Sequence, residues 1–489
     1  MIPTLLGLEP EKWSGKLFSN GWTSGQSGTL PVKEPATGIS LGEVASASAT
    51  DVRDGAAQAK SAQAKWAEYP LAERAPIFRR AARFLEANAD QVKEWIVRET
   101  GSVPAKAAVE LKLTIAEIYE AAAMVTQPRG LVLPSEHKVT SLARRLPHGV
   151  VGVISPFNFP MILSMRAVAP ALAVGNAVVL KPDPRTPVVG GMIIARAFEE
   201  AGLPDGLLHV LPGGAEAGEA LVTDPDVAMI SFTGSTAVGR RIGALAGERL
   251  KKVSLELGGK NSLIILDDAD LDLAVSNTAW GAFLHQGQIC MATGRVLVPA
   301  SLAARFIEKL TETANRLPVG DPFREQVALG PLIDQGQVDR ALGIVNDSVG
   351  AGARLRAGGT ADGAFFRPTV LDEVGPGMPA FEREIFAPVA PITVYRTDEE
   401  AIELANMTYY GLSAGIISGL SARALEFAAQ LKVGLCHVND QTVADEAHAP
   451  FGGTGASGNG SSHGGPANWD AFTRWQWLTV KHAAPSYPF

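Results

Sequence analysis

Cysteine is scarce in this sequence. Its 489 residues contain only two cysteines, Cys290 and Cys436, so neither a disulfide framework nor a cysteine-based metal cluster can be built from them. The eight histidines also lack the spacing of metal ligands, and no metal site is predicted. Because reduced thiols persist in a reducing compartment, the sequence favours a cytoplasmic location.

An excess of positive charge is also missing. Lysine and arginine together number 43 against 51 aspartates and glutamates, and the formal net charge is −8. A protein that binds nucleic acid needs a basic surface to neutralise phosphates. The charge balance therefore excludes nucleic acid as a chain-wide partner and fits a soluble protein.

Long hydrophobic runs are absent as well. The N-terminal MIPTLLGLEPEKW has neither the basic region nor the apolar stretch of a signal peptide, so none is expected. The longest uncharged apolar stretch, Ala167–Leu180, is shorter than a membrane span and is interrupted by Pro170, Gly175 and Asn176, so we expect no membrane insertion. With 46% hydrophobic and 19% charged residues, the chain can bury large cores, which excludes disorder as its dominant state.

The first half of the chain turns from helical to strand-like patterns. A cap at Thr50-Asp51 predicts one helix, and two more are predicted over Pro76–Thr100, ending at Gly101, and over Ala105–Met124. Short β-branched runs then alternate with helical segments. The predicted strands are Gly149–Ser155, Ala177–Lys181, Leu207–Leu211 and Ala228–Phe232, and the helices between them are Pro160–Ala173, Val188–Ala201 and Ala215–Thr223. This alternation indicates a parallel sheet covered on both faces, which binds ligands at the carboxyl ends of its strands.

A second alternating segment follows from about Lys260 to Asn439. Its strand-like runs are NSLIIL, ATGRVLVP, APITVYR, SAGIIS and GLCHVN, and its helical segments include Ser301–Arg316 and Ser421–Leu431. A polar, alternating segment near Arg129–Leu146 interrupts the first half. It fits either an arm that leaves its domain or an ordinary surface hairpin. The fold class is therefore α/β, with two sheets.

Cys290 is the stronger of the two thiol candidates for chemistry. It lies in HQGQICMATGR, a loop-like run before a possible helix start, which would expose the thiol and lower its pKa. A buried, inert cysteine is the alternative. Cys436 lies within the apolar run GLCHVN and is predicted to be a core thiol.

Further candidates stand at predicted strand ends. Glu256 in VSLELGGK is either a solvated residue or a base with a raised pKa. Asn158 in SPFNFP either donates to an oxyanion or forms a turn with its own backbone. The run Phe232–Ser235 with Gly239 resembles a phosphate-binding turn at a helix start, although the G-x-G-x-x-G fingerprint is absent.

Together and in this order, the motifs resemble those of the aldehyde dehydrogenase superfamily over essentially the whole chain. The matching pieces are SPFNFP, VVLKP, FTGST-x-VG, LELGGK, GQ-x-C, EIFAPV, NM-x-YYGLSA and PFGG-x-GASG. Within the superfamily, HQGQICMATGR, LKPDPRTP, ILSMR and PFGGTGASGNGSSHGG look most like the benzaldehyde and vanillin dehydrogenase branch. The resemblance implies NAD(P)-dependent oxidation of an aromatic aldehyde to its carboxylic acid.

The resemblance also implies catalytic roles. Cys290 would be the nucleophile that adds to the aldehyde carbonyl and then carries a thioester. The side-chain amide of Asn158 and the backbone N–H of Cys290 would hold the oxyanion. Glu256 would activate the water that hydrolyses the thioester, and CoA-acylating relatives lack a glutamate at this position.

A set of positions matches the cofactor contacts of the family. They are Ser155, Pro156, Phe157, Lys181, Pro184, Gly214, Phe232, Gly234, Ser235, Leu257, Glu384 and Phe386. Many NAD-specific members carry a glutamate where Pro184 stands, so the repulsion that would exclude a 2′-phosphate is missing, although Asp183 is adjacent. Arg185 could pair with such a phosphate if it points inward, and NAD or NADP is the expected cofactor. Ala387 replaces the common glycine of EIFGPV, a departure expected to be minor.

The substrate wall implied by the resemblance is mostly apolar or aromatic, which suits a flat aromatic ring. It comprises Phe159, Leu163, Arg166, Ile289, Met291 and Phe451. Arg166 would either meet a carboxylate or phenolate of the substrate or form a structural ion pair. The alternatives are therefore an aliphatic or semialdehyde dehydrogenase, a non-catalytic family member, and a thiol esterase that needs no cofactor.

By resemblance the chain has three parts. Residues 1–125 and 147–257 would form a Rossmann-like NAD(P)-binding domain, and residues 258–458 a second doubly wound, catalytic domain. Residues 126–146 and 459–489 would form a small β oligomerisation arm and the C-terminal tail. The arm would add to the sheet of a second copy, so the chain itself is the expected partner, in a homodimer or tetramer.

Overall fold

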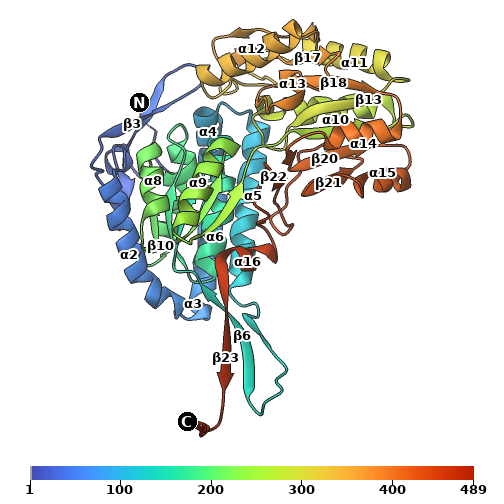
Figure 1. Cartoon of the computed structure of the whole chain (residues 1–489). Coiled ribbons are helices and arrows are strands. Elements are labelled where there is room, and N and C mark those ends of the chain that lie inside the picture. Colours follow the sequence, from blue (N-terminus) through green and yellow to red (C-terminus); the bar gives the residue numbers. More distant parts are fainter. Residues whose placement is uncertain (1–2) are drawn as a thin grey trace.

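A computed structural model describes residues 3–489 and contains two seven-stranded sheets and a three-stranded one (Figure 1). The first large sheet has the strand order β11-β10-β7-β8-β9-β1-β2. Its strands are β7 (Val150–Ile154), β8 (Ala177–Lys181), β9 (Leu208–Val210), β10 (Val227–Thr233), β11 (Lys252–Glu256), β1 (Leu17–Phe18) and β2 (Trp22–Thr23). The strands from β11 to β9 are parallel, as the alternating pattern predicts, whereas β1 adds an antiparallel edge.

Helices cover both faces of this sheet. They are α2 (Ala49–Ala67), α3 (Leu71–Ala87), α4 (Ala89–Thr100), α5 (Pro104–Met124), α6 (Pro160–Ala173), α7 (Ile193–Glu200), α8 (Ala215–Thr223) and α9 (Thr236–Glu248). The predicted cap at Thr50-Asp51 is two residues late, because Ser48 caps α2 and Asp51 closes the capping box. The predicted helix over Pro76–Thr100 is two helices that break at Asn88, and the second ends at Gly101 in the left-handed conformation.

The second large sheet has the strand order β14-β17-β18-β13-β12-β20-β21. Its strands are β14 (Arg354–Ala357), β17 (Thr369–Asp372), β18 (Val389–Tyr395), β13 (Thr293–Pro299), β12 (Asn261–Ile265), β20 (Ser413–Ile417) and β21 (Leu435–Val438). Its helices are α10 (Leu271–Phe283), α11 (Ala303–Arg316), α12 (Gln335–Gly350), α14 (Asp398–Asn406) and α15 (Ser421–Ala428). Along β12, Ile264 packs into one apolar cluster while Leu263 and Ile265 pack into another. Both faces of the sheet are therefore buried, which explains its uninterrupted hydrophobic runs.

The position of Cys436 differs from the one predicted from the sequence. It was expected in the core, but it is exposed. It lies on β21, which pairs only with β20 and is therefore the last strand of its sheet. An apolar run shows that a segment is a strand but not that the strand is central.

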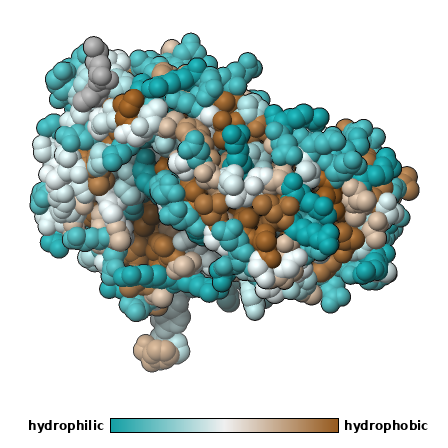
Figure 2. Space-filling model, turned by 90° about the horizontal axis from the view of Figure 1, so that it is seen from above, coloured by the Kyte–Doolittle hydropathy of each residue, from teal (hydrophilic) through white to brown (hydrophobic). Residues whose placement is uncertain are grey.

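A slender arm extends from the body of the molecule (Figure 1). It consists of β5 (Gly130–Val132), β6 (Thr140–Pro147) and β23 (Thr473–Val480), with β6 in the middle. The alternating segment near Arg129–Leu146 therefore forms an arm and not a hairpin on the body. Elsewhere the surface seen from above is mostly hydrophilic, and hydrophobic residues gather in its hollows (Figure 2). No helix within residues 3–489 is long and apolar enough to cross a membrane.

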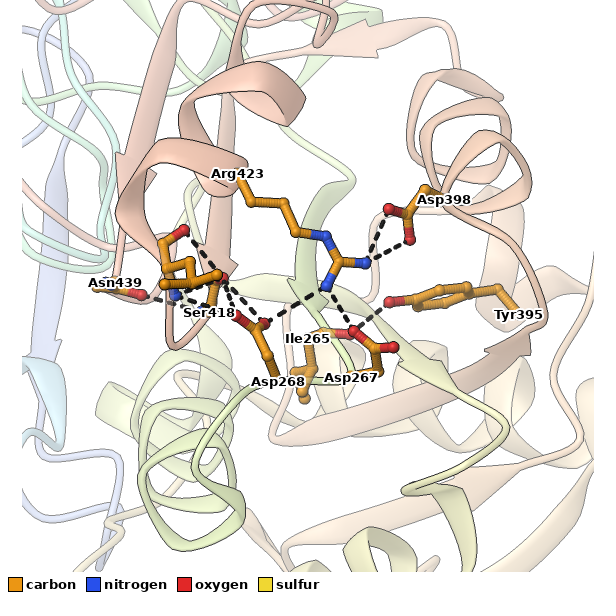
Figure 3. A network of polar contacts seen from close by, with 9 residues as sticks. Ile265, Asp267, Asp268, Tyr395, Asp398, Ser418, Arg423 and Asn439 are labelled. Carbon is orange, nitrogen blue, oxygen red and sulfur yellow. Dashed lines mark hydrogen bonds and ion pairs between the residues drawn. The ribbon is translucent and has the colours of Figure 1, made fainter.

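The carboxyl edge of the second large sheet is closed by a polar network (Figure 3). Arg423 on α15 contacts Asp398 through two hydrogen bonds of 2.8 Å and pairs with Asp267 at 2.5 Å. Ser418, at the end of β20, donates to Asp268 at 2.9 Å. Because these carboxylates are satisfied by protein groups, this edge is stabilised by its own side chains.

Arg423 also lies 3.7 Å from Asp268. We expect the Arg423→Met variant to lose about 1–2 kcal/mol of unfolding free energy, because Asp267, Asp268 and Asp398 would be left without their shared cation. Chemical denaturation followed by circular dichroism measures this. The control is Arg354→Met, which removes an exposed pair with Glu373 and should change stability by less than about 0.5 kcal/mol. Equal losses in the two variants would contradict a special role for the network.

Candidate active site

Strand ends of the first large sheet meet at a cleft between the two domains. The register places Ile154 beside Lys181, and Thr233 beside Glu256. The cleft has a volume of about 540 Å³. Every sequence-predicted cofactor residue lines it, and so do Asn158, Leu163 and Cys290. The cleft therefore lies where parallel sheets are expected to bind ligands, at the carboxyl ends of the strands.

Two glycines shape the start of α9 at this cleft. A Cβ on Gly234 would lie 2.5 Å from the ring of Phe232, and one on Gly239 would lie 2.3 Å from Leu257. Ser235 caps the helix, since its side chain accepts a hydrogen bond from the backbone N–H of Val238. The two glycines thus let the start of α9 pack closely against Phe232 and Leu257. The helix N-terminus itself lines the cleft, and such an end favours a pyrophosphate.

The end of β8 brings three charged groups to the cleft. The Lys181 Nζ donates to the carbonyl oxygens of Pro182 (3.2 Å) and Gly213 (2.9 Å). Arg185 donates to both carboxylate oxygens of Asp183 at 2.9 Å and to Asp334 at 2.9 Å, and its guanidinium lies 4.0 Å from the ring of Phe157. Arg185 is therefore occupied by two carboxylates rather than free to meet a phosphate.

The second domain contributes Glu384 and Phe386 to the same cleft. The Glu384 carboxylate accepts a hydrogen bond from the backbone N–H of Gly259 at 3.0 Å, and burial raises its pKa. Phe386 has a φ of 59°, an unusual value for a bulky residue, and packs edge-on against Phe157 at 5.8 Å. Backbone strain of this kind gathers at functional sites. A dinucleotide cofactor fits this set of glycines, strand ends and carboxylates.

Cys290 lies on a loop before β13, at the amino edge of the second large sheet. The loop contains three consecutive residues with positive φ, which are His285 (48°), Gln286 (56°) and Gly287 (68°). Gln286 holds it by donating to the carbonyl oxygens of Gly101 (3.0 Å) and Pro331 (2.8 Å). The nucleophile candidate is thus placed by the loop and not by a helix.

The pKa of the Cys290 thiol is shifted in the direction opposite to the one predicted from the sequence. Burial, together with the nearby carboxylates of Glu384 and Glu256, raises it to about 12. The predicted helix start after Cys290 is absent, since the chain enters β13 directly, and no helix dipole favours the thiolate. A lowered pKa was the wrong prediction, because the carboxylates come from distant segments of the chain.

Asn158 is fixed against the same loop. It is 3% exposed, and its Nδ2 donates to the carbonyl oxygen of Gln288 at 2.8 Å. The side chain therefore does not form a turn with its own backbone, which was the alternative interpretation. The amide carries a second N–H that this hydrogen bond does not use, and Asn158 and Cys290 line the same cleft.

Glu256 ends β11 and is 3% exposed, and neither of its carboxylate oxygens has a hydrogen-bond partner in residues 3–489. Burial raises the pKa of this carboxyl well above its ordinary value, although the charge of Arg166 opposes the shift. It is thus a buried, unpaired carboxyl and not a solvated strand-end residue. Such a group is suited to accept a proton.

The residues predicted to line the aldehyde site divide into three sets, and the third is Arg166 alone. Ile289, Met291 and Phe451 form an apolar cluster with Leu412, and both Phe159 and Cys290 pack against it. Leu163 instead lines the cofactor cleft. The apolar cluster is the surface that an aromatic ring beside the thiol would contact.

Arg166 is 4% exposed and lies in an ion-pair network. It contacts Glu117 on α5 at 3.3 Å and Asp445, and its guanidinium is 4.5 Å from the ring of Phe451. Burial opposes its charge, but Asp445 and Glu117 raise its pKa. The structure thus favours the structural ion pair over a substrate contact. Sequence reasoning missed Glu117 and Asp445, because only the fold brings them to Arg166.

Comparison with known proteins identifies the family of the chain. Residues 22–478 match the aldehyde dehydrogenase family model. The chain is 54% identical to a vanillin dehydrogenase of Amycolatopsis sp. over 99% of both chains, and 49% identical to a benzaldehyde dehydrogenase [NAD(+)] of Pseudomonas putida over 98% of both. The crystal structure of a salicylaldehyde dehydrogenase from Pseudomonas putida G7 complexed with salicylaldehyde superposes with a TM-score of 0.94 at 35% identity, covering 97% of this chain and 99% of that one. The chain belongs to the aldehyde dehydrogenase family.

Proposed function

We propose that the enzyme oxidises aromatic aldehydes of the benzaldehyde or vanillin type to carboxylic acids, with NAD or NADP as the hydride acceptor. The observation that carries the substrate class is the apolar cluster of Ile289, Met291, Leu412 and Phe451 beside Cys290. A flat ring loses little conformational entropy on binding and gains contact area against such a surface. The names of the relatives support the same class.

We propose the following chemistry for the residues of the site. The Cys290 Sγ gives up its proton to solvent water and forms a bond to the carbonyl carbon, and the carbonyl electron pair moves onto oxygen. The Asn158 amide and the Cys290 N–H would stabilise that oxyanion, an interaction worth about 3 kcal/mol per donor. Bound NAD or NADP would supply the hydride acceptor in the cleft. The resulting Cys290 thioester is attacked by water, whose proton passes to Glu256, and the thiolate leaves as the acid is released.

A substrate panel tests this function. With NAD and NADP in parallel, kcat/KM should be higher for benzaldehyde and vanillin than for hexanal and succinic semialdehyde by at least about tenfold, which is about 1.4 kcal/mol. Since Glu117 and Asp445 neutralise Arg166, a substrate carboxylate would find no unpaired cation there. A preference for succinic semialdehyde would contradict the aromatic assignment, and ester turnover without cofactor alone would favour the esterase.

We also propose that the enzyme prefers NAD to NADP, because Asp183 presents a carboxylate near Lys181 and occupies Arg185. In the Asp183→Ala variant, we expect the ratio of kcat/KM for NADP to that for NAD to rise about tenfold, since repulsion disappears and Arg185 loses one of its two carboxylate partners. Cofactor Kd from fluorescence quenching provides a second readout. Asp334→Ala is the matched control, because it frees one side of Arg185 and leaves Asp183 in place. An equal shift in both variants would contradict a specific role for Asp183.

We propose that the arm joins two copies of the chain into a homodimer or tetramer, in the cytoplasm. Its outer strand β5 and the sheet edge β21 each have an unpaired side, and such edges accept strands. Val132 and Trp477 on the arm are 81% and 73% exposed, respectively. Light scattering should give a multiple of the monomer mass that Val132→Lys reduces, and a monomeric wild type would contradict the proposal.

A further inference from the structure

A second cavity lies behind the loop that carries Cys290, in the domain of the second large sheet. Its volume is about 50 Å³, and it is enclosed by the starts of β12, β13 and β20 and by the segments 405–412 and 431–433. A water molecule needs about 10–15 Å³ of such space. The cavity therefore has room for a monoatomic ion together with water.

Two buried cations line this cavity without a carboxylate partner. Lys260 and Arg295 are 2% and 1% exposed, and neither forms an ion pair in the described part of the chain. Among the other buried cations, Lys106 pairs with Glu110 and Arg166 pairs with two acids, whereas Lys181 and Arg74 donate to backbone carbonyl oxygens. The Lys260 ammonium has neither kind of partner. Buried charges in proteins are ordinarily paired, because transfer of an isolated ion from water is costly.

The two cations are not equivalent. Arg295 donates to the carbonyl oxygens of Leu404 (2.9 Å) and Ala405 (2.9 Å), so its charge is partly balanced by the C-terminus of α14. The Lys260 Nζ has no hydrogen-bond partner, and neither does the Arg295 Nε or the hydroxyl of Ser262, which also lines the cavity. Three donors thus lack an acceptor. Burial and the charge of Arg295 hold the pKa of Lys260 well below its ordinary value.

We propose that this cavity binds a monovalent inorganic anion of the halide class, held by Lys260 with Ser262 and Arg295 around it. One anion would neutralise the ammonium and supply an acceptor for the unpaired donors. Lys432, an exposed residue at the rim, adds positive charge where an ion would enter from solvent. The proposal does not rest on the enzyme's substrate or cofactor.

The site is connected to the nucleophile through one residue. Asn261 follows Lys260, and its Nδ2 donates to the carbonyl oxygens of Cys290 (2.8 Å) and Ala292 (2.9 Å). Its Oδ1 accepts from the backbone N–H of Ser413 at 3.0 Å. An ion that fixes Lys260 therefore stabilises the strand start from which Asn261 holds the catalytic loop.

Anomalous diffraction from crystals grown in bromide tests the site directly. We expect a bromide peak between Lys260 and Arg295 in the full-length wild type and no peak there in Lys260→Met. Water alone at this position in the wild type would overturn the proposal, since Lys260 would then be a neutral amine. A peak that persists in Lys260→Met would also overturn it, because the site would not depend on the ammonium.

Thermal unfolding gives an independent readout in solution. At matched ionic strength, the wild type should have a Tm several degrees higher in sodium chloride or bromide than in sodium gluconate, because a ligand that binds only the folded state stabilises it. The difference should vanish in Lys260→Gln, which serves if the methionine variant does not fold. Lys309→Met, which removes an exposed pair with Asp272, is the control and should keep the difference. Equal anion effects in Lys260→Gln and the wild type would contradict a specific site.

Discussion

Replacing Cys290 by serine is expected to lower kcat for benzaldehyde by at least about 10³-fold, because a hydroxyl is far harder to ionise than a thiol and forms an ester that hydrolyses slowly. Formation of reduced cofactor, followed by its absorbance, measures the loss. Binding of the oxidised cofactor, followed by fluorescence, should be unchanged, since the cleft is lined by many other groups.

Cys436→Ser is the matched control for this experiment. It removes the only other thiol, which is exposed on β21, and should leave kcat near the wild-type value. If Cys290→Ser retained a tenth of the activity, the thioester mechanism would be wrong. Equal losses in the two variants would point to general oxidation or misfolding rather than to a nucleophile.

The Glu256→Gln variant should stop the reaction after hydride transfer. We expect steady-state kcat to fall by at least about 10²-fold, because the amide cannot accept the proton of the attacking water. A rapid burst of reduced cofactor, equal to the enzyme concentration, should remain, and mass spectrometry should detect the acyl group on Cys290. Loss of the burst together with the steady state would show that Glu256 acts before the thioester forms.

The pH dependence follows from the same two groups. Water activation needs the carboxylate of Glu256, whose pKa is raised by burial, and addition needs the thiolate of Cys290, whose pKa is raised to about 12. The thiolate requirement makes kcat/KM rise with pH through the alkaline range, and the carboxylate requirement makes kcat rise with pH in the same way. A flat profile in that range would contradict these shifts.

Glu256 should also affect stability. Its folded-state pKa lies above the unfolded value, so the folded protein holds this proton more tightly, and the associated stability is lost as pH rises through the folded pKa. At alkaline pH, Glu256→Gln should therefore have a higher Tm than the wild type. A lower Tm would show that the carboxylate has partners that the structure does not place.

The local patterns of the sequence predicted helices and strands well where the limits of the element depend only on nearby residues. Strand β8 and helix α6 have the predicted limits, because apolar runs and flanking prolines and glycines fix them within a few residues. The motifs predicted to form the cofactor site are also local, since each lies at a strand end or on a loop, and the fold brings them to one cleft. The break of the helix at Asn88 was missed, because helical periodicity continues on both sides of it.

Other features depend on which segments the fold brings together. Arg166 pairs with Glu117 on α5 and with Asp445, which lie far before and far after it in the sequence. No local pattern of the sequence identifies these two partners. Cys436 is exposed because β21 ends its sheet, and strand order is a property of the whole domain. The raised pKa of Cys290 likewise comes from carboxylates on other elements.

The left-handed turn at His285–Gly287 has a consequence for how the protein folds. Two non-glycine residues in this conformation cost roughly 2–4 kcal/mol, so the turn is unstable as an isolated segment. Its anchors come from both domains, since Gln286 bonds to Gly101 and Pro331, and Asn158 bonds to Gln288. Neither domain alone supplies them all. The surroundings of Cys290 are therefore completed only when these segments pack together, and we expect a refolding chain to regain its helices and sheets before it regains activity.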